Sequence, residues 1–184
     1  MSKIEVGDVF PFESLESVSG STVSLRGGSG IFHLYLGRFS GCSACNFNLK
    51  QLANKYDEFK KAAIKNVVVI HSPKDTIMEN QGSKFGWTNK IEFVADPQRE
   101  TYRKVGADMD VTMMLTWYVF TAVTLAKTEF QVKDRGIGEG VSQRPLDLLL
   151  DAKSGKVLEK FYGSRPSDAW SPAQVIELSK KHSA

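Results

Sequence analysis

The sequence predicts an α/β fold in which helices flank a mixed central sheet. Three observations support this prediction: two short and almost entirely apolar runs lie on either side of an amphipathic stretch, a hairpin signal appears late in the chain, and a well-capped helix follows it. The chain has 184 residues, of which 41% are hydrophobic and 24% are charged. This length and balance are typical of one globular domain with its own core, and we expect a single domain over residues 1–184.

A parallel unit of strand, helix and strand opens the predicted sheet. Residues 31–36 are nearly all apolar, as expected of a strand that is covered on both faces. Over residues 47–63 apolar side chains recur at intervals of three and four with charged residues between them, which indicates an amphipathic helix. Residues 67–70 form the second buried strand, and a crossover of this length is right-handed. The alternation continues with a short strand at 91–94 and a short helix at 98–105.

An antiparallel hairpin and a final helix complete the predicted fold. Residues 146–150 and 156–162 flank a turn in which Gly155 suits a left-handed conformation. Residues 171–174 begin the last helix, because a serine can cap it, a proline suits its first position and a glutamine completes a capping box. A parallel unit, an antiparallel hairpin and a closing helix, in that order, are typical of a thioredoxin-like fold.

The segment of about 107–143 does not belong to the minimal version of that fold. It contains an uncharged run, residues 111–126, and then a polar loop before the strand at 146–150. A transmembrane helix needs about 20 mostly apolar residues, whereas this run is shorter and rich in threonine. We therefore expect a helical insertion that is buried or lies at an interface, and no association with a membrane.

Charge and the N-terminal residues narrow the expected partners and compartment. The formal net charge of +3 is small and the lysines are spread between acidic residues, so we expect no nucleic-acid partner. The first residues lack the apolar core of a signal peptide, which predicts a cytoplasmic protein in a compartment that keeps thiols reduced. In such a compartment, two cysteines separated by two residues are more often catalytic than structural.

The two cysteines of the chain carry the strongest functional signal. Cys42 and Cys45 lie directly after the first predicted strand and at the start of the first predicted helix. The N-terminus of a helix stabilises a thiolate, the reactive form of cysteine, so Cys42 is the candidate nucleophile. Cys45, one helical turn later, is close enough to condense with an oxidised Cys42. The charge of Arg38 can lower the pKa of Cys42 and hold a substrate oxygen; the alternative is an arginine on a surface loop.

Two other interpretations of the cysteine pair remain open at this point. The pair can be two small buried side chains, or half of a zinc site. Tetrahedral zinc needs four ligands, and His33, His71 and His182 do not have the spacing that would complete such a set within one chain. We therefore expect no metal and no other cofactor.

Five motifs occur in an order that matches a known family. They are Gly-Asp followed by Pro-Phe at 7–12, Arg38-Phe39-Ser40-Gly41-Cys42-Ser43-Ala44-Cys45, an Asp-Pro stretch at 96–106, the hairpin at 144–157, and Tyr-Gly with a later Asp at 162–168. On these residues the chain resembles the peroxiredoxin-like branch of the alkyl hydroperoxide reductase/thiol-specific antioxidant family, most closely its peroxiredoxin-like 2 type with a CxxC. The resemblance covers nearly the whole chain outside 107–143.

The resemblance implies roles for individual residues. Cys42 would be the peroxidatic cysteine and Cys45 the resolving one, and Pro145 would be a cis-proline that faces them. The substrate would lie against two segments that together contribute Ser40, Gly41, Ser43, Arg144 and Pro145. A thioredoxin-like protein or glutathione would be the reductant, and a homodimer is one assembly that fits.

Two positions depart from the pattern of that family. Peroxiredoxins proper have a Thr or Ser three residues before the peroxidatic cysteine and a Pro seven residues before it, whereas this chain has Phe39 and Tyr35 at these places. The hydroxyl group that would orient a peroxide is therefore missing, unless Ser40 replaces it.

Three functions are consistent with the cysteine pair. The first is a thiol-dependent antioxidant enzyme that reduces hydrogen peroxide or organic hydroperoxides through a Cys42 sulfenate, which Cys45 resolves to an intramolecular disulfide. The second is a dithiol-disulfide oxidoreductase that acts on protein or small-molecule disulfides. The third belongs to a different class, a non-catalytic thioredoxin-fold module that senses redox state or binds a partner.

Overall fold

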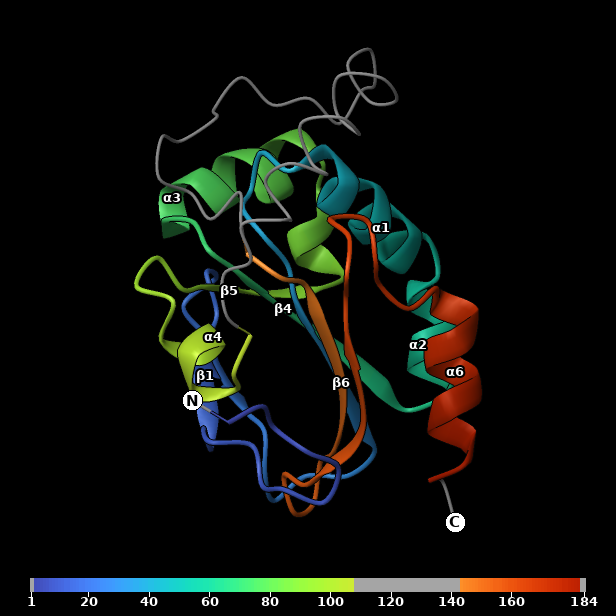
Figure 1. Ribbon diagram of the computed structural model, residues 1–184. Helices are drawn as coiled ribbons and strands as arrows, with labels where there is room; N and C mark the ends of the chain where they lie inside the picture. The colour runs from blue at the N-terminus through green and yellow to red at the C-terminus, as the bar shows by residue number, and fades with distance from the viewer. Residues whose placement is uncertain (1, 108–142, 183–184) are drawn as a thin grey trace.

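The computed structural model describes residues 2–107 and 143–182, and in it a central sheet separates two layers (Figure 1). The sheet has five strands in the order β5-β4-β3-β6-β7. The strands are β3 (Ile31–Leu36), β4 (Ile64–Ile70), β5 (Glu92–Ala95), β6 (Leu146–Asp151) and β7 (Val157–Tyr162). Strand β3 pairs in parallel with β4 and antiparallel with β6, so the sheet is mixed, as predicted.

Strand β3 lies at the centre of the sheet and is covered on both faces. All six of its residues are buried, which explains why its sequence shows no alternation of apolar and polar residues. Beyond its two neighbours, β5 continues the parallel half of the sheet and β7 the antiparallel half. The hairpin between β6 and β7 closes with Gly155 at a φ of +73°, the left-handed conformation that the sequence predicted.

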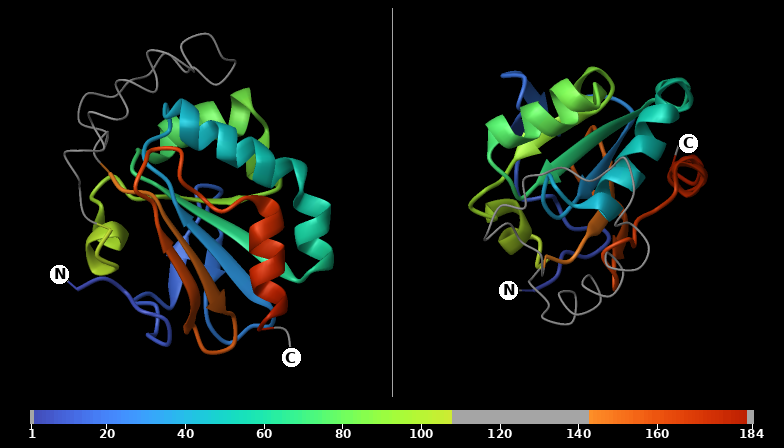
Figure 2. Two further views of the ribbon diagram at one scale, coloured as in Figure 1. Left: turned by 45° about the vertical axis from the view of Figure 1, so that its right-hand side comes forward. Right: turned by 90° about the horizontal axis from the view of Figure 1, so that it is seen from above.

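Three helices cover one face of the sheet (Figures 1 and 2). They are α1 (Ser43–Asn54), α2 (Tyr56–Lys61) and α6 (Pro172–Lys180). Helix α6 begins with the predicted capping box: the Ser171 hydroxyl accepts the N–H of Gln174 at 3.3 Å, and the Gln174 side chain accepts the N–H of Ser171 at 2.9 Å. The buried side chains of this layer include Tyr35, Leu49, Leu52, Phe59, Val68, Leu149 and Val175.

A two-stranded sheet and a short helix cover the other face. Strands β1 (Ser14–Glu16) and β2 (Thr22–Ser24) pair antiparallel, and α4 (Glu100–Lys104) lies beside them. The hydroxyl of Tyr102 in α4 donates to the carbonyls of Gly37 and Val69, at 2.8 and 2.9 Å. This shared hydrogen bond ties α4 to the ends of β3 and β4, the edge of the sheet at which the cysteines lie.

The connection from β4 to β5 is helical, which the sequence analysis did not predict. It consists of α3 (Lys74–Ile77), the π-helix η1 (Met78–Lys84) and the 3₁₀ turn η2 (Trp87–Asn89). Gly86 separates the last two with a φ of +67°, a conformation that suits glycine. Through η1 this connection reaches the loop that carries the cysteines.

Two predicted helices have different bounds in the structure. Two helices take the place of the one predicted over 47–63. Helix α1 already begins at Ser43 and ends before Lys55, and α2 begins directly after that residue. The helix predicted over 98–105 has only five residues. It begins late because the Asp96 carboxylate accepts the N–H groups of Glu100 and Thr101, each at 2.8 Å, and thereby caps the first turn.

The predicted cis peptide bond before Pro145 is wrong. The described residues contain no cis bond, so Arg144 and Pro145 are joined in the trans form, which is the more stable form by about 0.5–1 kcal/mol. The carbonyl of Pro145 accepts the N–H of Gly163 at 2.9 Å, which extends the pairing of β6 and β7 by one step. Proline therefore precedes β6 without turning the chain out of the sheet.

The helical insertion predicted at about 107–143 lies outside the described residues except at its two ends. Within the described ranges, no helix is both long enough and apolar enough to cross a membrane.

Candidate active site

The loop from β3 to α1 carries both cysteines at the carboxyl end of the parallel strands. The N–H of Gly37 donates to Val69 at 2.9 Å and the N–H of His71 donates to Arg38 at 2.9 Å, which continues the pairing of β3 and β4 into the loop. The chain then turns, and the N–H of Cys42 donates to the carbonyl of Phe39 at 3.0 Å. These bonds place Cys42 at the N-cap position of α1.

Two hydrogen bonds converge on the Cys42 sulfur. It accepts the backbone N–H of Cys45 at 3.3 Å and an N–H of the Arg38 guanidinium at 3.7 Å. Burial alone would raise the pKa of the Cys42 thiol, but the Cys45 thiol, the charge of Arg38 and the Cys45 N–H together lower that pKa from 9.0 to about 6. Cys42 is therefore mostly thiolate at neutral pH.

The pKa of the Cys45 thiol shifts in the opposite direction. Burial and the neighbouring Cys42 sulfur raise its pKa well above 9.0. Both cysteines are free thiols and both are buried. Of the two thiols Cys42 is thus the more acidic and Cys45 stays protonated, so Cys42 is the candidate to react first.

Arg38 is not a surface residue. Its side chain is completely buried, and its guanidinium also lies over the Phe39 ring, 5.5 Å from the centroid. Burial strengthens the attraction between the guanidinium and the thiolate, because little water screens the two charges. Of the two alternatives that the sequence left open, the structure supports the one in which Arg38 lies against Cys42.

The Ser40 hydroxyl is committed to a buried network. It donates to the side-chain carbonyl of Gln81 at 2.7 Å and accepts from Asn80 at 2.8 Å. The Gln81 amide in turn donates to the Ser40 carbonyl and to Asn46, at 3.0 and 2.8 Å. A hydroxyl has one proton, and Gln81 takes it, so the structure does not support the hypothesis that Ser40 donates to a peroxide.

The other predicted substrate-binding residues lie at the same end of the sheet. Ser43 is buried in the first turn of α1, and Gly41 precedes the N-cap half-buried. Leu36, the last residue of β3, pairs with Leu146, the first residue of β6. The loop that follows β3 and Pro145, which precedes β6, therefore lie at the same end of the sheet. Pro145 is buried there and Arg144 is half-buried. The fold thus places all the predicted site residues at one edge, although their contacts with substrate stay predictions.

Sequence reasoning missed one polar group beside the cysteines. Tyr35 is buried on β3, and its hydroxyl has no hydrogen-bond partner among the described residues. The sequence does mark this position, because Tyr35 stands seven residues before Cys42, where peroxiredoxins proper have a proline. That difference alone does not indicate that the tyrosine hydroxyl lies near the cysteines. The amides of Asn46, Asn80 and Gln81 were also missed, because no sequence pattern places η1 against this loop.

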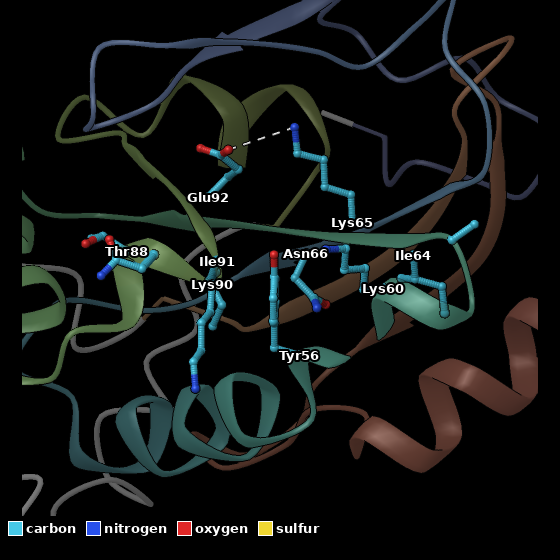
Figure 3. A pocket seen from close by; sticks show the side chains of 11 residues that line it. Tyr56, Lys60, Ile64, Lys65, Asn66, Thr88, Lys90, Ile91 and Glu92 are labelled. Carbon is cyan, nitrogen blue, oxygen red and sulfur yellow. Dashed lines mark ion pairs between the residues drawn. The ribbon is translucent and has the colours of Figure 1, made fainter. Parts of the chain in front are cut away.

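A cavity of about 360 Å³ lies elsewhere in the molecule (Figure 3). It is bounded by α2, by the beginning of β4 and by the segment before β5, and its lining includes Tyr56, Lys60, Asn66 and Lys90. Since β3 and β4 run in parallel, this is the end of the sheet opposite to the cysteines. Among the described residues, no His, Cys, Asp and Glu side chains gather in a group of three or more that could hold a metal ion.

Comparison with known proteins identifies the fold. No family model matches the chain, and no curated protein sequence matches it. Solved structures do match: Mycobacterium bovis AhpC has a TM-score of 0.67 at 12% identity, over 100% of this chain and 95% of its own. A reduced 2-Cys peroxiredoxin of Plasmodium vivax has a TM-score of 0.63 at 12% identity, over 96% and 95% of the two chains. A reduced Prx3 of Vibrio vulnificus, solved in complex with hydrogen peroxide, has a TM-score of 0.67 at 12% identity, over 96% and 99%.

These likenesses confirm the predicted thioredoxin-like fold, in the form that peroxiredoxins have. At 12% identity they concern the fold alone. The chemistry of this chain has to be argued from its own residues.

Proposed function

We propose that this chain, which has the fold of peroxiredoxins, is a thiol peroxidase that reduces hydrogen peroxide or small organic hydroperoxides with Cys42. The observation that carries the proposal is the position of the Cys42 sulfur, which accepts an N–H of the Arg38 guanidinium and the backbone N–H of Cys45, two donors that favour its ionised form. The peroxiredoxin structures that share the fold, one of them in complex with hydrogen peroxide, agree with this chemistry. A cytoplasmic setting, in which the thiols stay reduced, is part of the proposal.

In the first step the Cys42 thiolate attacks one oxygen of the peroxide. A sulfur–oxygen bond forms as the O–O bond breaks, and the other oxygen leaves with a proton from water as an alcohol or as water. The sulfur becomes a sulfenic acid, and the peroxide is reduced by two electrons. The Arg38 guanidinium donates hydrogen bonds throughout, so it stabilises the charge that moves from sulfur to oxygen.

In the second step Cys45 resolves the sulfenic acid. The Cys45 thiol loses its proton, its sulfur attacks the Cys42 sulfur, and the hydroxyl leaves with a proton as water. The resulting disulfide closes over one turn of α1 and protects Cys42 from further oxidation. A thioredoxin-like protein or glutathione then reduces it by thiol-disulfide exchange.

Access is part of the mechanism. The Cys42 side chain is fully covered, so a peroxide or a reductant reaches the sulfur only when covering residues move. A small peroxide needs a smaller opening than a protein disulfide does, which favours peroxide as the oxidising substrate.

One observation favours the second candidate, dithiol-disulfide exchange. Because Gln81 takes the Ser40 proton, the loop supplies no serine donor for a peroxide oxygen, whereas exchange with a disulfide needs only the unequal pair of thiols. The third candidate is not an enzyme: it is a thioredoxin-fold module that senses redox state or binds a partner.

Stopped-flow oxidation of the reduced protein separates the three candidates. The peroxidase forms a Cys42–Cys45 disulfide at a rate proportional to peroxide concentration, and Cys42→Ser abolishes the reaction. Slow reaction with peroxide but rapid exchange with glutathione disulfide or insulin would replace the first candidate by the second. A chain that reacts with neither is a redox sensor or a binding module.

A further inference from the structure

The Tyr35 hydroxyl is a buried polar group for which the mechanism above has no role. Tyr35 is only 1% exposed, and its oxygen has no hydrogen-bond partner among the described residues. A buried polar atom without a partner costs free energy that a phenylalanine would not. The position therefore suggests a partner that is present in another state of the molecule.

The surroundings of Tyr35 identify that partner. Its ring belongs to the same buried cluster as Leu49, Leu52 and Ala53, so it lies beneath α1. Leu49 follows Cys45 by one helical turn, so the two side chains lie on the same face of α1, and the Cys45 sulfur is one of the groups that raise the pKa of the Tyr35 hydroxyl. On the strand side, Tyr35 is paired with Asp147 of β6. The hydroxyl thus approaches the cysteine pair from the sheet, on the side of Cys45.

We propose that Tyr35 is a positioning residue for the resolving cysteine, whose hydroxyl donates a hydrogen bond to the Cys45 sulfur when that sulfur becomes a thiolate. This inference rests on the proposed function in assigning the resolving step to Cys45. The hydroxyl stabilises the thiolate that attacks the Cys42 sulfenic acid and the thiolate released when a reductant opens the disulfide. In both steps Tyr35 keeps its proton.

The electrostatics of the pocket agree with a donor role. Burial, the two cysteine sulfurs and Asp147 raise the pKa of Tyr35 well above 10.0, so it stays a neutral phenol. In the reduced state the Cys45 sulfur is itself protonated and bonds to Cys42, and it offers only a weak acceptor to Tyr35. Loss of the Cys45 proton creates the strong acceptor that the hydroxyl lacks.

The test replaces Tyr35 by phenylalanine, which keeps the ring and removes only the unpartnered oxygen. The reduced variant is mixed with hydrogen peroxide, and quenched samples are treated with dimedone, which traps sulfenic acid. We expect sulfenic acid to form at the wild-type rate and the disulfide to form about tenfold more slowly, so that the dimedone adduct accumulates. Tyr162→Phe is the matched control: it removes another hydroxyl, one that bonds to Ile4 and Val105, and it leaves both rates unchanged.

A second measurement does not depend on peroxidase activity. In Cys42→Ser, Cys45 is the only cysteine, and its ¹³Cβ chemical shift reports its titration. The charged and titratable groups that act on it are Arg38, Tyr102 and Tyr35 itself, with Asp147 beyond. Adding Tyr35→Phe should move the midpoint of Cys45 upward by about one pH unit, a tenfold loss of thiolate at fixed pH. A role of Tyr35 in packing alone would not move it.

The two proposals fail in different ways. A wild-type chain that forms no sulfenic acid overturns the peroxidase, and the Cys45 midpoint then decides the role of Tyr35 by itself. If Tyr35→Phe leaves the midpoint of Cys45 unchanged, the positioning role is overturned, whatever the reaction with peroxide shows.

Discussion

The Arg38 guanidinium lies 3.7 Å from the Cys42 sulfur, and both side chains are completely buried. A buried positive charge is costly unless an opposite charge compensates it, and a thiolate does so here. The two residues therefore stabilise each other: the guanidinium favours the ionised form of the sulfur, and an ionised sulfur offsets part of the cost of burying the arginine. A purely structural pair of cysteines would need no such neighbour.

Removal of the Arg38 charge should return Cys42 toward an ordinary thiol. A thiol with a pKa of about 6 is roughly nine-tenths thiolate at pH 7, whereas one near 9 is about one per cent thiolate. We expect Arg38→Met to raise the ¹³Cβ titration midpoint of Cys42 by at least about one pH unit. Arg38→Lys keeps a positive charge but not the planar guanidinium, so its Cys42 midpoint should lie between those of the wild type and of the methionine variant. An unchanged midpoint in the methionine variant would refute the electrostatic role of Arg38.

The Cys45 thiol should stabilise the Cys42 thiolate as well as resolve it. Its hydrogen bond is the largest of the contributions that lower the pKa of Cys42. Cys45→Ala removes this donor and Cys45→Ser retains a hydroxyl in its place, so we expect Cys42 to titrate at higher pH in the alanine variant. Both variants should accumulate the dimedone adduct after peroxide treatment. Equal midpoints would show that the thiol does not act as a donor.

The stability of the reduced protein should depend on pH through Cys42. Its pKa is lower in the folded chain than in the unfolded chain, so its contribution is fully present above the unfolded value, about 9, and is lost as the pH falls toward 6. Between pH 8 and pH 6 the free energy of unfolding, taken relative to Cys42→Ser, should fall by about 2 kcal/mol. Urea unfolding under reducing conditions measures this difference. A difference that stays constant with pH would mean that Cys42 is not ionised in the folded state.

A buried hydrogen-bonded pair in the core should matter for stability more than surface ion pairs do. The His33 ring bonds to Asp147 at 2.9 Å and to Asn66 at 2.8 Å, and Asp147 also accepts the N–H of Trp170 at 3.3 Å. Asp147→Ala leaves a buried ring nitrogen of His33 without its hydrogen-bond partner and should lower the free energy of unfolding by about 1–3 kcal/mol.

Glu58 provides the matched surface control for that measurement. It pairs with Lys55, and both side chains are at least half exposed. Glu58→Ala should therefore cost less than about 1 kcal/mol. If the two variants lose the same stability in urea unfolding, burial does not strengthen the pair of His33 and Asp147.

The sequence predicted the elements whose signals are local. The apolar run that became β3, the hairpin with Gly155 and the capping box at Ser171 each depend on residues a few positions apart, and each is confirmed. The cysteine pair also lies at the start of α1, where the change of period from strand to helix placed it, although the helix begins at Ser43 and not at 47. His33, in the middle of the apolar strand β3, is buried with both ring nitrogens hydrogen-bonded.

Predictions about groups that contact residues far away in the sequence were less accurate. The bond before Pro145 is trans, whereas the resemblance alone had implied a cis bond. The hydroxyl of Ser40 was assigned to substrate, but η1, some 40 positions later, takes its proton. No local pattern in the sequence states which loop will lie beside another.

By itself, the sequence determined the order of the five strands of the central sheet, the helical stretch between β3 and β4 and the closing helix, and it placed the cysteine pair at the start of a helix, because periodicity and capping are properties of neighbouring residues. Only the tertiary structure decided the protonation of that pair. The pKa of a buried thiol depends on which charges and donors surround it, and those that surround Cys42 and Cys45 come from the loop before α1, from the first turn of α1 and from the strand beneath it.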